Sequence, residues 1–287
     1  MTVAPVRTLV RTMPAVALLG ALGLAPAVSS PIPSAGVGAV SDRSVANRSV
    51  ANRSVRAASS EAVVSAGSAG YAVQRVTLPD GRRVVVRFNP CQAAVTYKVN
   101  VAAVPSSSRA SVLAEIRSGV TRLSATTGIG YRYRGTTTEV PRTSSIDRQS
   151  AELVVAVSTS RSTDVGIGGS TVGMGGYHYW VWQATSASGR LVAGAAIGRS
   201  WVVLDRDGLA RLRPGFGAAA TRGNVILHEL GHSVGLEHVT DSRQLMFPSL
   251  SSAAPNGYAA GDRAGLVELG RSAGCLAVPA NVFTDLS

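Results

Sequence analysis

The chain has 287 residues, enough for one large domain with a complete hydrophobic core. Its formal net charge of +12 comes from 28 Lys and Arg against 16 Asp and Glu. Because the arginines are scattered rather than clustered in a run, the composition favours a solvated basic surface over a nucleic-acid-binding protein.

The N-terminal segment has the features of a secretory signal peptide. Arg7 and Arg11 supply positive charge, residues 13–24 are apolar, and Ala25-Pro26-Ala27 offers small residues for cleavage. The apolar run is short for a membrane span, so a signal peptide over residues 1–28 is preferred to an uncleaved anchor. We therefore expect a secreted protein with no membrane association after cleavage.

Residues 29–70 form a low-complexity segment. The pentapeptide Arg43-Ser44-Val45-Ala46-Asn47 is repeated directly as residues 48–52, and Ser, Ala and Gly fill much of the rest. So few large apolar side chains cannot offset the entropy lost on ordering the chain. The segment is predicted to be a disordered linker or a pro-segment, followed by one domain over residues 71–287.

The first part of that domain is predicted to contain a hairpin, a strand and a helix. A turn at Pro79-Asp80-Gly81 joins strands 71–78 and 82–88, and residues 94–101 alternate as a half-buried strand does. A helix is expected from Ser106 to about Thr126. Its apolar face consists of Val112, Leu113, Ile116, Val120 and Leu123.

The middle of the chain is predicted to be mostly extended. Four segments read as strands, namely 131–135, 153–157, 191–197 and 200–204. The glycine-rich span 166–176 precedes an extended segment at 177–182. Since no helix pattern with a Lys-Ser/Thr pair follows these glycines, we reject a phosphate-binding loop and expect an irregular, bulged edge segment.

A helix predicted to begin at Asn224 carries the most specific pattern in the chain. Residues 228–238 read H-E-x-x-H-x-x-G-x-x-H and contain three of the four histidines. His228 and His232 are four residues apart, so they share one helical face and can bind one metal ion. Gly235 can end the helix and turn the chain, which makes His238 a third ligand. A buried helix whose histidines only hydrogen-bond in the core would not require this spacing.

The residue types in this pattern indicate hydrolysis assisted by zinc. Three imidazole ligands leave one coordination position of zinc open for water, as hydrolytic sites require. Glu229 is adjacent to the first ligand and can act as the general base. The pattern therefore predicts peptide hydrolysis without a covalent intermediate.

Two downstream segments make the likeness more specific. Leu245-Met246-Phe247-Pro248 is similar to the Met-turn of metzincins, in which a methionine packs beneath the three histidines, and residues 258–266 resemble the start of the C-terminal helix of matrixins. Residues 124–133 are similar to the first-helix exit of the same family. Over about 90–287 the chain resembles a bacterial matrixin-type metzincin peptidase.

This resemblance implies an α+β fold with a twisted mixed β-sheet, an active-site helix below it and a small C-terminal subdomain. It implies one catalytic zinc held by His228, His232 and His238, with Glu229 as the catalytic base and Met246 beneath the metal. A protein or peptide substrate would lie in the cleft and pair with an edge strand drawn from residues 168–182. We expect the domain to act as a monomer.

Several residues depart from the family pattern. His178 is the one remaining histidine, so we expect the second, structural zinc of the mammalian enzymes to be absent and His178 to be a surface or cleft residue. Calcium stays open through Asp164, Asp205 or Asp207, although no calcium-loop spacing is legible. Tyr258 is assigned to packing, with an oxyanion-donor role as the alternative.

The two cysteines, Cys91 and Cys275, are predicted to form one disulfide, as an even pair does in an exported protein. Two free thiols, or a Cys91 that masks the zinc, are the alternatives. Asn89-Pro90-Cys91-Gln92 does not match the latency motif of the mammalian matrix metalloproteases.

Two other function classes stay open. One is a catalytically silent metal-binding protein on the same fold, against which the intact Glu229 argues. The other is a cell-wall-associated module whose basic face binds anionic wall polymer.

Overall fold

A six-stranded mixed sheet lies at the centre of the part that the structure describes. The structure is a computed structural model, and it describes residues 7–9, 70–185, 189, 191–250 and 252–278. The strands of this sheet are β1 (Arg7–Leu9), β5 (Val95–Asn100), β6 (Tyr131–Thr136), β7 (Leu153–Ser158), β8 (Gly173–Thr185) and β9 (Leu191–Asp205). Their spatial order is β1-β8-β9-β7-β5-β6. The pairs β9–β7, β7–β5 and β5–β6 are parallel, whereas β8 is antiparallel to β9 and to β1.

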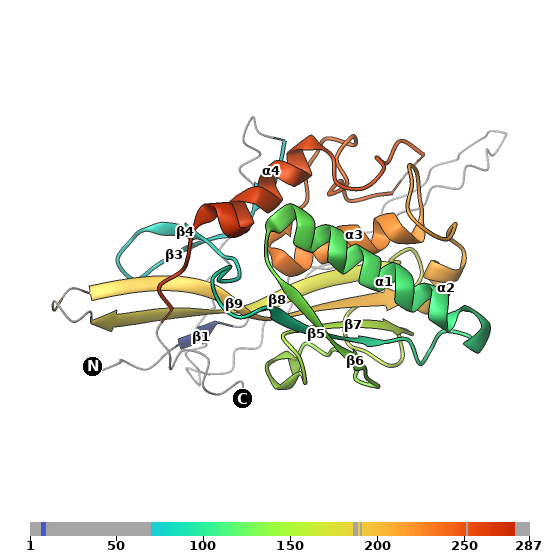
Figure 1. The fold of residues 1–287 in the computed structure, drawn as a ribbon, viewed down its shortest axis with the longest axis horizontal. Coiled ribbons are helices and arrows are strands. Elements are labelled where there is room, and N and C mark those ends of the chain that lie inside the picture. Colours follow the sequence, from blue (N-terminus) through green and yellow to red (C-terminus); the bar gives the residue numbers. More distant parts are fainter. Residues whose placement is uncertain (1–6, 10–69, 186–188, 190, 251, 279–287) are drawn as a thin grey trace, which may run out of the picture. The chain divides into compact units, whose positions relative to one another are not determined.

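The longer helices cover one face of the sheet (Figure 1). The helical elements are α1 (Ser106–Thr127), η1 (Ile146–Arg148), α2 (Arg206–Ala210), α3 (Arg222–Val234), α4 (Ala260–Leu269) and η2 (Arg271–Ala273). α1 ends at Gly128, whose φ of 69° is left-handed and therefore suits glycine. Among the described residues, no helix has the length and apolar character to cross a membrane.

The main hydrophobic core lies between the sheet, α1 and α3. It includes the fully buried side chains of Val99, Ile116, Leu123, Val155, Ile226 and Leu230. A smaller cluster packs on the opposite face and contains Ile146, Val165, Ile167, Met174, Trp201 and Val203. Because both faces are covered, every residue of β7 is buried, as expected of a central parallel strand.

The α+β prediction is confirmed, with two corrections in the strands. Residues 173–176, expected to be irregular, belong to the regular strand β8, and the irregular part ends before them. Gly166, Gly168 and Gly169, with positive φ, lie in that preceding loop. The two segments predicted at 191–197 and 200–204 form one strand, β9, because a register shift between His178 and Tyr179 lets its pairing with β8 continue.

The N-terminal hairpin forms at the predicted turn. β3 (Arg75–Thr77) pairs with β4 (Arg83–Val85), and Gly81 occupies the turn with a φ of 82°. The residues before this hairpin form a separate strand, β2 (Ala72–Val73), which pairs with β10 (Leu236–Glu237). The sequence did not predict this second pairing.

The N-terminal region is described only at β1. β1 belongs to the predicted signal peptide and pairs with Tyr179–Val181 of β8. Residues 10–69, which include the predicted low-complexity segment, lie outside the described residues. The signal peptide, the linker or pro-segment and the boundary at residue 71 therefore stay predictions.

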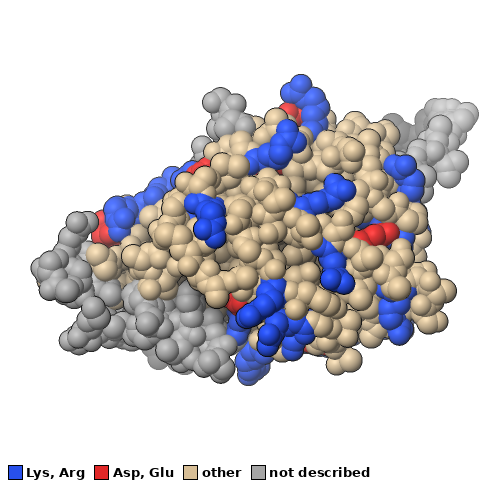
Figure 2. Space-filling view, in the orientation of Figure 1, with Lys and Arg blue, Asp and Glu red and all other residues tan. Residues whose placement is uncertain are grey.

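Basic side chains are spread over the surface. Figure 2 shows Lys and Arg distributed across the face that carries α1, with few acidic side chains between them. Glu115, the one acidic residue of α1, pairs at 3.1 Å with Arg222 of α3, and each side chain is only 11% exposed. The basic side chains of α1, namely Arg109, Arg117 and Arg122, are exposed, which is the distribution of a solvated basic surface.

The predicted bond between Cys91 and Cys275 is present and joins two residues separated by 184 positions in the sequence. Hydrogen bonds accompany it: Arg87 donates to the carbonyls of Ala273 and Gly274 at 3.1 and 2.8 Å, and the Asn89 side chain donates to Leu276 O at 3.1 Å. The segment after α4 is therefore held beside the segment after β4.

We expect the double variant Cys91→Ser/Cys275→Ser to lose about 4–5 kcal/mol of unfolding free energy, because the bridge closes a very long loop in the unfolded chain. Urea unfolding of the oxidised wild type and the variant measures the difference. Thiol titration of the native protein serves as the control and should find no free thiol. Equal urea midpoints for the two proteins would contradict the expectation.

Candidate metal centre

Helix α3 runs through the core and carries the first two histidines. Thr221 caps its N-terminus by accepting a 3.1 Å hydrogen bond from Asn224 N. The helix ends at Gly235, whose φ of 111° is left-handed and whose N–H bonds back to Gly231 and His232 carbonyls. Glycine is needed there for a second reason, since an added Cβ would lie 2.9 Å from Val86 O. The motif glycine thus both ends the helix and lets another segment approach it.

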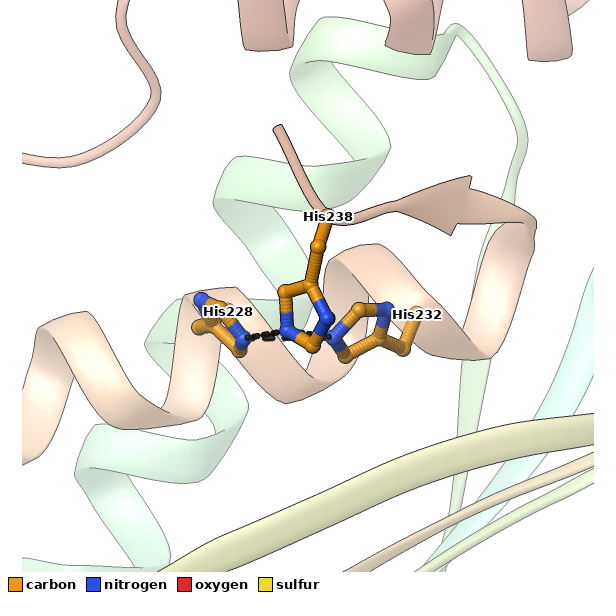
Figure 3. Close-up of side chains that lie close together, drawn as sticks. All are labelled: His228, His232 and His238. Carbon is orange, nitrogen blue, oxygen red and sulfur yellow. Dashed lines mark hydrogen bonds between the residues drawn. The ribbon is translucent and has the colours of Figure 1, made fainter. Parts of the chain in front are cut away.

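The structure brings the three predicted ligands together. Figure 3 shows the rings of His228 and His232, from α3, and of His238, from the chain after β10, pointing toward one another. Their Nε2 atoms are 3.1 Å apart for His228–His232, 3.1 Å for His232–His238 and 3.2 Å for His228–His238. No other group of three or more potential ligands comes together within the described ranges.

Backbone carbonyls determine which ring nitrogens face the centre. His228 Nδ1 lies 2.7 Å from Leu245 O, and His232 Nδ1 lies 2.8 Å from Leu236 O. A carbonyl oxygen only accepts, so each of these Nδ1 atoms must carry the proton. In a neutral ring the Nε2 atom then has a lone pair directed at the other histidines.

The protonation of these rings favours a bound cation. Burial lowers the pKa of His228 to about 3 and that of His232 to about 4, and the neighbouring His232 adds to the effect at His228. Burial likewise lowers the pKa of His238. The rings are therefore neutral at pH 7, and their converging lone pairs repel one another unless a cation lies between them.

The donor set fits zinc. Tetrahedral zinc with Zn–N bonds of about 2.0–2.1 Å requires nitrogen atoms about 3.3 Å apart. The observed Nε2 separations of 3.1–3.2 Å are close to this value. Neutral imidazoles whose Nδ1 atoms donate to carbonyls, as those of His228 and His232 do, are also the ligand form that zinc sites use.

Met246 lies directly against the helix that carries the ligands. A Cβ added at Gly231, between the two helical histidines, would be 2.7 Å from Met246 Sδ, so the thioether fills the space that glycine leaves. Met246 is buried, and its carbonyl accepts a 3.1 Å hydrogen bond from Val239 N. Met246 therefore packs against α3 between the two helical histidines, and its assignment to a Met-turn stays a prediction.

Asp262 of α4 holds the turn that contains Met246. Its carboxylate accepts hydrogen bonds from Leu245 N at 2.7 Å, Met246 N at 3.1 Å and Ala259 N at 2.8 Å. The side chain is fully buried. Because Leu245 O in turn accepts from His228, Asp262 positions the first ligand through one residue of backbone.

Glu229 is buried between α3 and β8. Burial raises the pKa of Glu229 to about 8, while a hydrogen bond from the Gly175 backbone N–H opposes the rise. Glycines make this approach possible: a Cβ at Gly173 would lie 2.8 Å from Glu229 Cγ, and one at Gly175 would lie 2.1 Å from Glu229 O. A carboxyl group adjacent in sequence to the first ligand, with a pKa raised from its ordinary range, is a candidate for proton transfer.

Other residues singled out in the sequence lie elsewhere. His178 is buried within β8, so the surface or cleft prediction is wrong; it pairs in register with Arg199 of β9. The Tyr258 hydroxyl donates to Leu227 O at 2.7 Å, which supports the packing role.

The three candidate calcium carboxylates are engaged locally and do not form a cluster of ligands within the described residues. Asp164 accepts from the Thr143 backbone and hydroxyl, and Asp205 caps α2. Asp207 pairs with Arg206 at 2.8 Å.

Sequence reasoning missed the groups that orient the ligands. Leu245 O and Leu236 O are backbone atoms, which no residue pattern marks. The glycines of β8 were visible as a pattern, but their reason, the close approach of Glu229, is a tertiary contact. Asp262 was noted only as part of a family-like segment.

Comparison with known families agrees with this geometry. Residues 181–269, from the end of β8 to the end of α4, match the family model described as Matrixin. No curated protein matches the chain. The matched segment contains the three converging histidines, Glu229 and Met246, so over residues 181–269 the chain is similar to the matrixin family of metzincin peptidases.

Proposed function

We propose that the protein is a secreted zinc-dependent endopeptidase with a single catalytic zinc. The convergence of three neutral imidazole Nε2 atoms beside a buried carboxylate carries this proposal. When bound, zinc would polarise the scissile carbonyl and make a water molecule more acidic. His228, His232 and His238 would hold it.

The remaining chemistry belongs to the chain. Glu229 takes the proton from the attacking water and passes it to the leaving amine, acting first as general base and then as general acid. Gly175 N–H orients the carboxylate. The turn that Asp262 holds, together with Met246, keeps α3 and the ligand rings in place.

An extended peptide is the substrate that the sheet favours. β8 is bordered by β9 on one side, and on the other side β1 pairs only with Tyr179–Val181 within the described residues. The stretch Gly173–Gly176, next to Glu229, therefore offers a strand edge to a substrate backbone. Pairing there would bring a peptide bond beside the general base.

Secretion is supported by the N-terminal sequence and by the disulfide. Residues 1–28 have the order of features of a signal peptide, and the Cys91–Cys275 bond is stable in oxidising compartments. N-terminal sequencing of the protein released by its host would identify the mature start.

Metal removal tests the proposal. Metal analysis of the purified protein should find about one zinc per chain. Treatment with a chelator should abolish cleavage of casein or a peptide library, and added zinc should restore it. Cleavage that continues unchanged in the metal-free protein would refute the proposed mechanism.

A further inference from the structure

The strand β2 lies against the segment that leads to the third histidine. Val73 pairs with Leu236 and Ala72 with Glu237, directly before His238. Gln74 N donates to Gly235 O at 3.2 Å, at the turn between α3 and β10. A segment more than 150 residues earlier in the chain thus borders the entire connection from Gly235 to Glu237.

This connection positions two of the three ligands. Leu236 O accepts from His232 Nδ1 at 2.8 Å and so keeps its Nε2 directed at the centre. His238 follows β10 directly, so the path of β10 decides where its ring lies. A displacement of β10 would disturb both rings, whereas His228 is held separately by Leu245 O.

β2 is itself anchored on α4. The Tyr71 ring packs where a Cβ on Gly265 would come within 2.9 Å of it, and the Leu236 side chain fills the adjoining space. The Tyr71 hydroxyl donates to Glu268 Oε2 at 2.5 Å, and Arg75 pairs with Glu268 Oε1 at 2.6 Å. Tyr71, just before β2, and Arg75, the first residue of β3, are therefore attached to one carboxylate.

The following hairpin closes the arrangement. Val86 N donates to Gln74 O at 3.0 Å, and Val86 O lies so close to Gly235 that a side chain there would collide with it. The turn after α3 is thus enclosed by residues on both sides of the β3–β4 hairpin. Gln74 and Val86, which enclose this turn, lie outside the matched segment 181–269.

We propose that residues 71–75 act as a positioning element for the metal centre, which holds β10 and through it His232 and His238. The inference rests on the proposed zinc function. It assigns to this N-terminal strand a role in metal retention that goes beyond stabilising the fold. Residues that support metal ligands from behind typically change metal affinity about 10–100-fold when they are altered.

The test compares two proline variants of the full chain. Gln74→Pro removes the N–H that donates to Gly235 O, whereas Val76→Pro places the same residue in β3, which pairs with β4 and not with β10. Chelator competition gives the zinc dissociation constant, and the visible spectrum of the cobalt-substituted protein reports the ligand geometry. Urea unfolding of the metal-free proteins shows how far each variant is destabilised.

We expect Gln74→Pro to weaken zinc binding about 10-fold or more and to alter the cobalt spectrum. Val76→Pro should keep the zinc dissociation constant within about 3-fold of wild type and should leave the cobalt spectrum unchanged. We expect this even if Val76→Pro lowers the urea unfolding midpoint as much as Gln74→Pro does. Tyr71→Phe loses only the hydroxyl bond to Glu268 and replaces Gln74→Pro in the test if the proline variant does not fold. We expect Tyr71→Phe to weaken zinc binding several-fold.

Wild-type affinity and spectrum in a folded Gln74→Pro, or in Tyr71→Phe if the proline variant does not fold, would overturn the inference. Equal losses of zinc affinity in Gln74→Pro and Val76→Pro would also overturn it, since they would indicate general destabilisation. A wild-type protein that does not bind zinc through three histidines would instead refute the proposed function itself.

Discussion

Replacing Glu229 by Gln is expected to lower kcat/KM by about 10²–10⁴-fold, the usual contribution of a positioned general base. The amide has nearly the same shape and can still accept the hydrogen bond from Gly175 N–H, so the packing against β8 should be kept. An amide cannot take a proton from water at neutral pH. The loss should therefore appear in catalysis and not in folding.

Three measurements on the same preparation separate these effects. Peptide cleavage gives kcat/KM, metal analysis gives the zinc content, and urea unfolding gives stability. Glu139→Gln is the control, because this substitution makes the same change of charge at a distant carboxylate. The Glu139 carboxylate accepts hydrogen bonds from the backbone and hydroxyl of Ser150. Retention of wild-type kcat/KM by Glu229→Gln would remove Glu229 from the mechanism, whereas loss of zinc would show that it has a structural role.

The sequence predicted the metal ligands because their geometry is local. His228 and His232 are separated by one helical turn, and Gly235 returns the chain after the helix ends, so three side chains within 11 residues of sequence are brought near one another by local structure. The orientation of the rings could not be predicted in the same way. It depends on two carbonyls, and the turn that contains Leu245 is held by α4 while Leu236 is held by β2.

The errors in the fold have a related cause. Glycines usually weaken a strand, so residues 173–176 favoured an irregular segment. In the structure Gly173 and Gly175 lie in a regular strand. These two positions are glycine because α3 passes so close that no side chain fits there. His178 was expected near the surface because a lone histidine is polar, yet its strand is covered on both faces. Such contacts between distant elements leave no periodic pattern in the sequence.

Replacing Asp262 by Ala is expected to reduce the unfolding free energy of the metal-free protein by about 4 kcal/mol. The substitution leaves three backbone N–H groups, those of Leu245, Met246 and Ala259, without their acceptor. Each buried donor that loses its partner costs about 1–3 kcal/mol. Water cannot easily replace the carboxylate, since Asp262 is fully buried and this burial raises its pKa.

Asp241→Ala is the matched control, because Asp241 lies in the same connection but forms an exposed pair with Arg243. Exposed pairs contribute little, so its urea midpoint should hardly change. Asp262→Asn should fall between the two, since one amide oxygen can still accept some of the three bonds. Equal midpoints for Asp262→Ala and Asp241→Ala would show that the Met-turn is held by other contacts.

The same variants also distinguish the two supports of the metal centre. Loss of Asp262 releases Leu245 N, so that Leu245 O can shift and should disturb His228, whereas loss of the β2 contact should disturb His232 and His238. Because the two supports act on different ligands, combining Asp262→Asn with Tyr71→Phe should weaken zinc binding by roughly the product of the single effects. A combined loss no larger than the greater single loss would mean that both act through one shared movement of α4, on which Asp262 and Glu268 both lie.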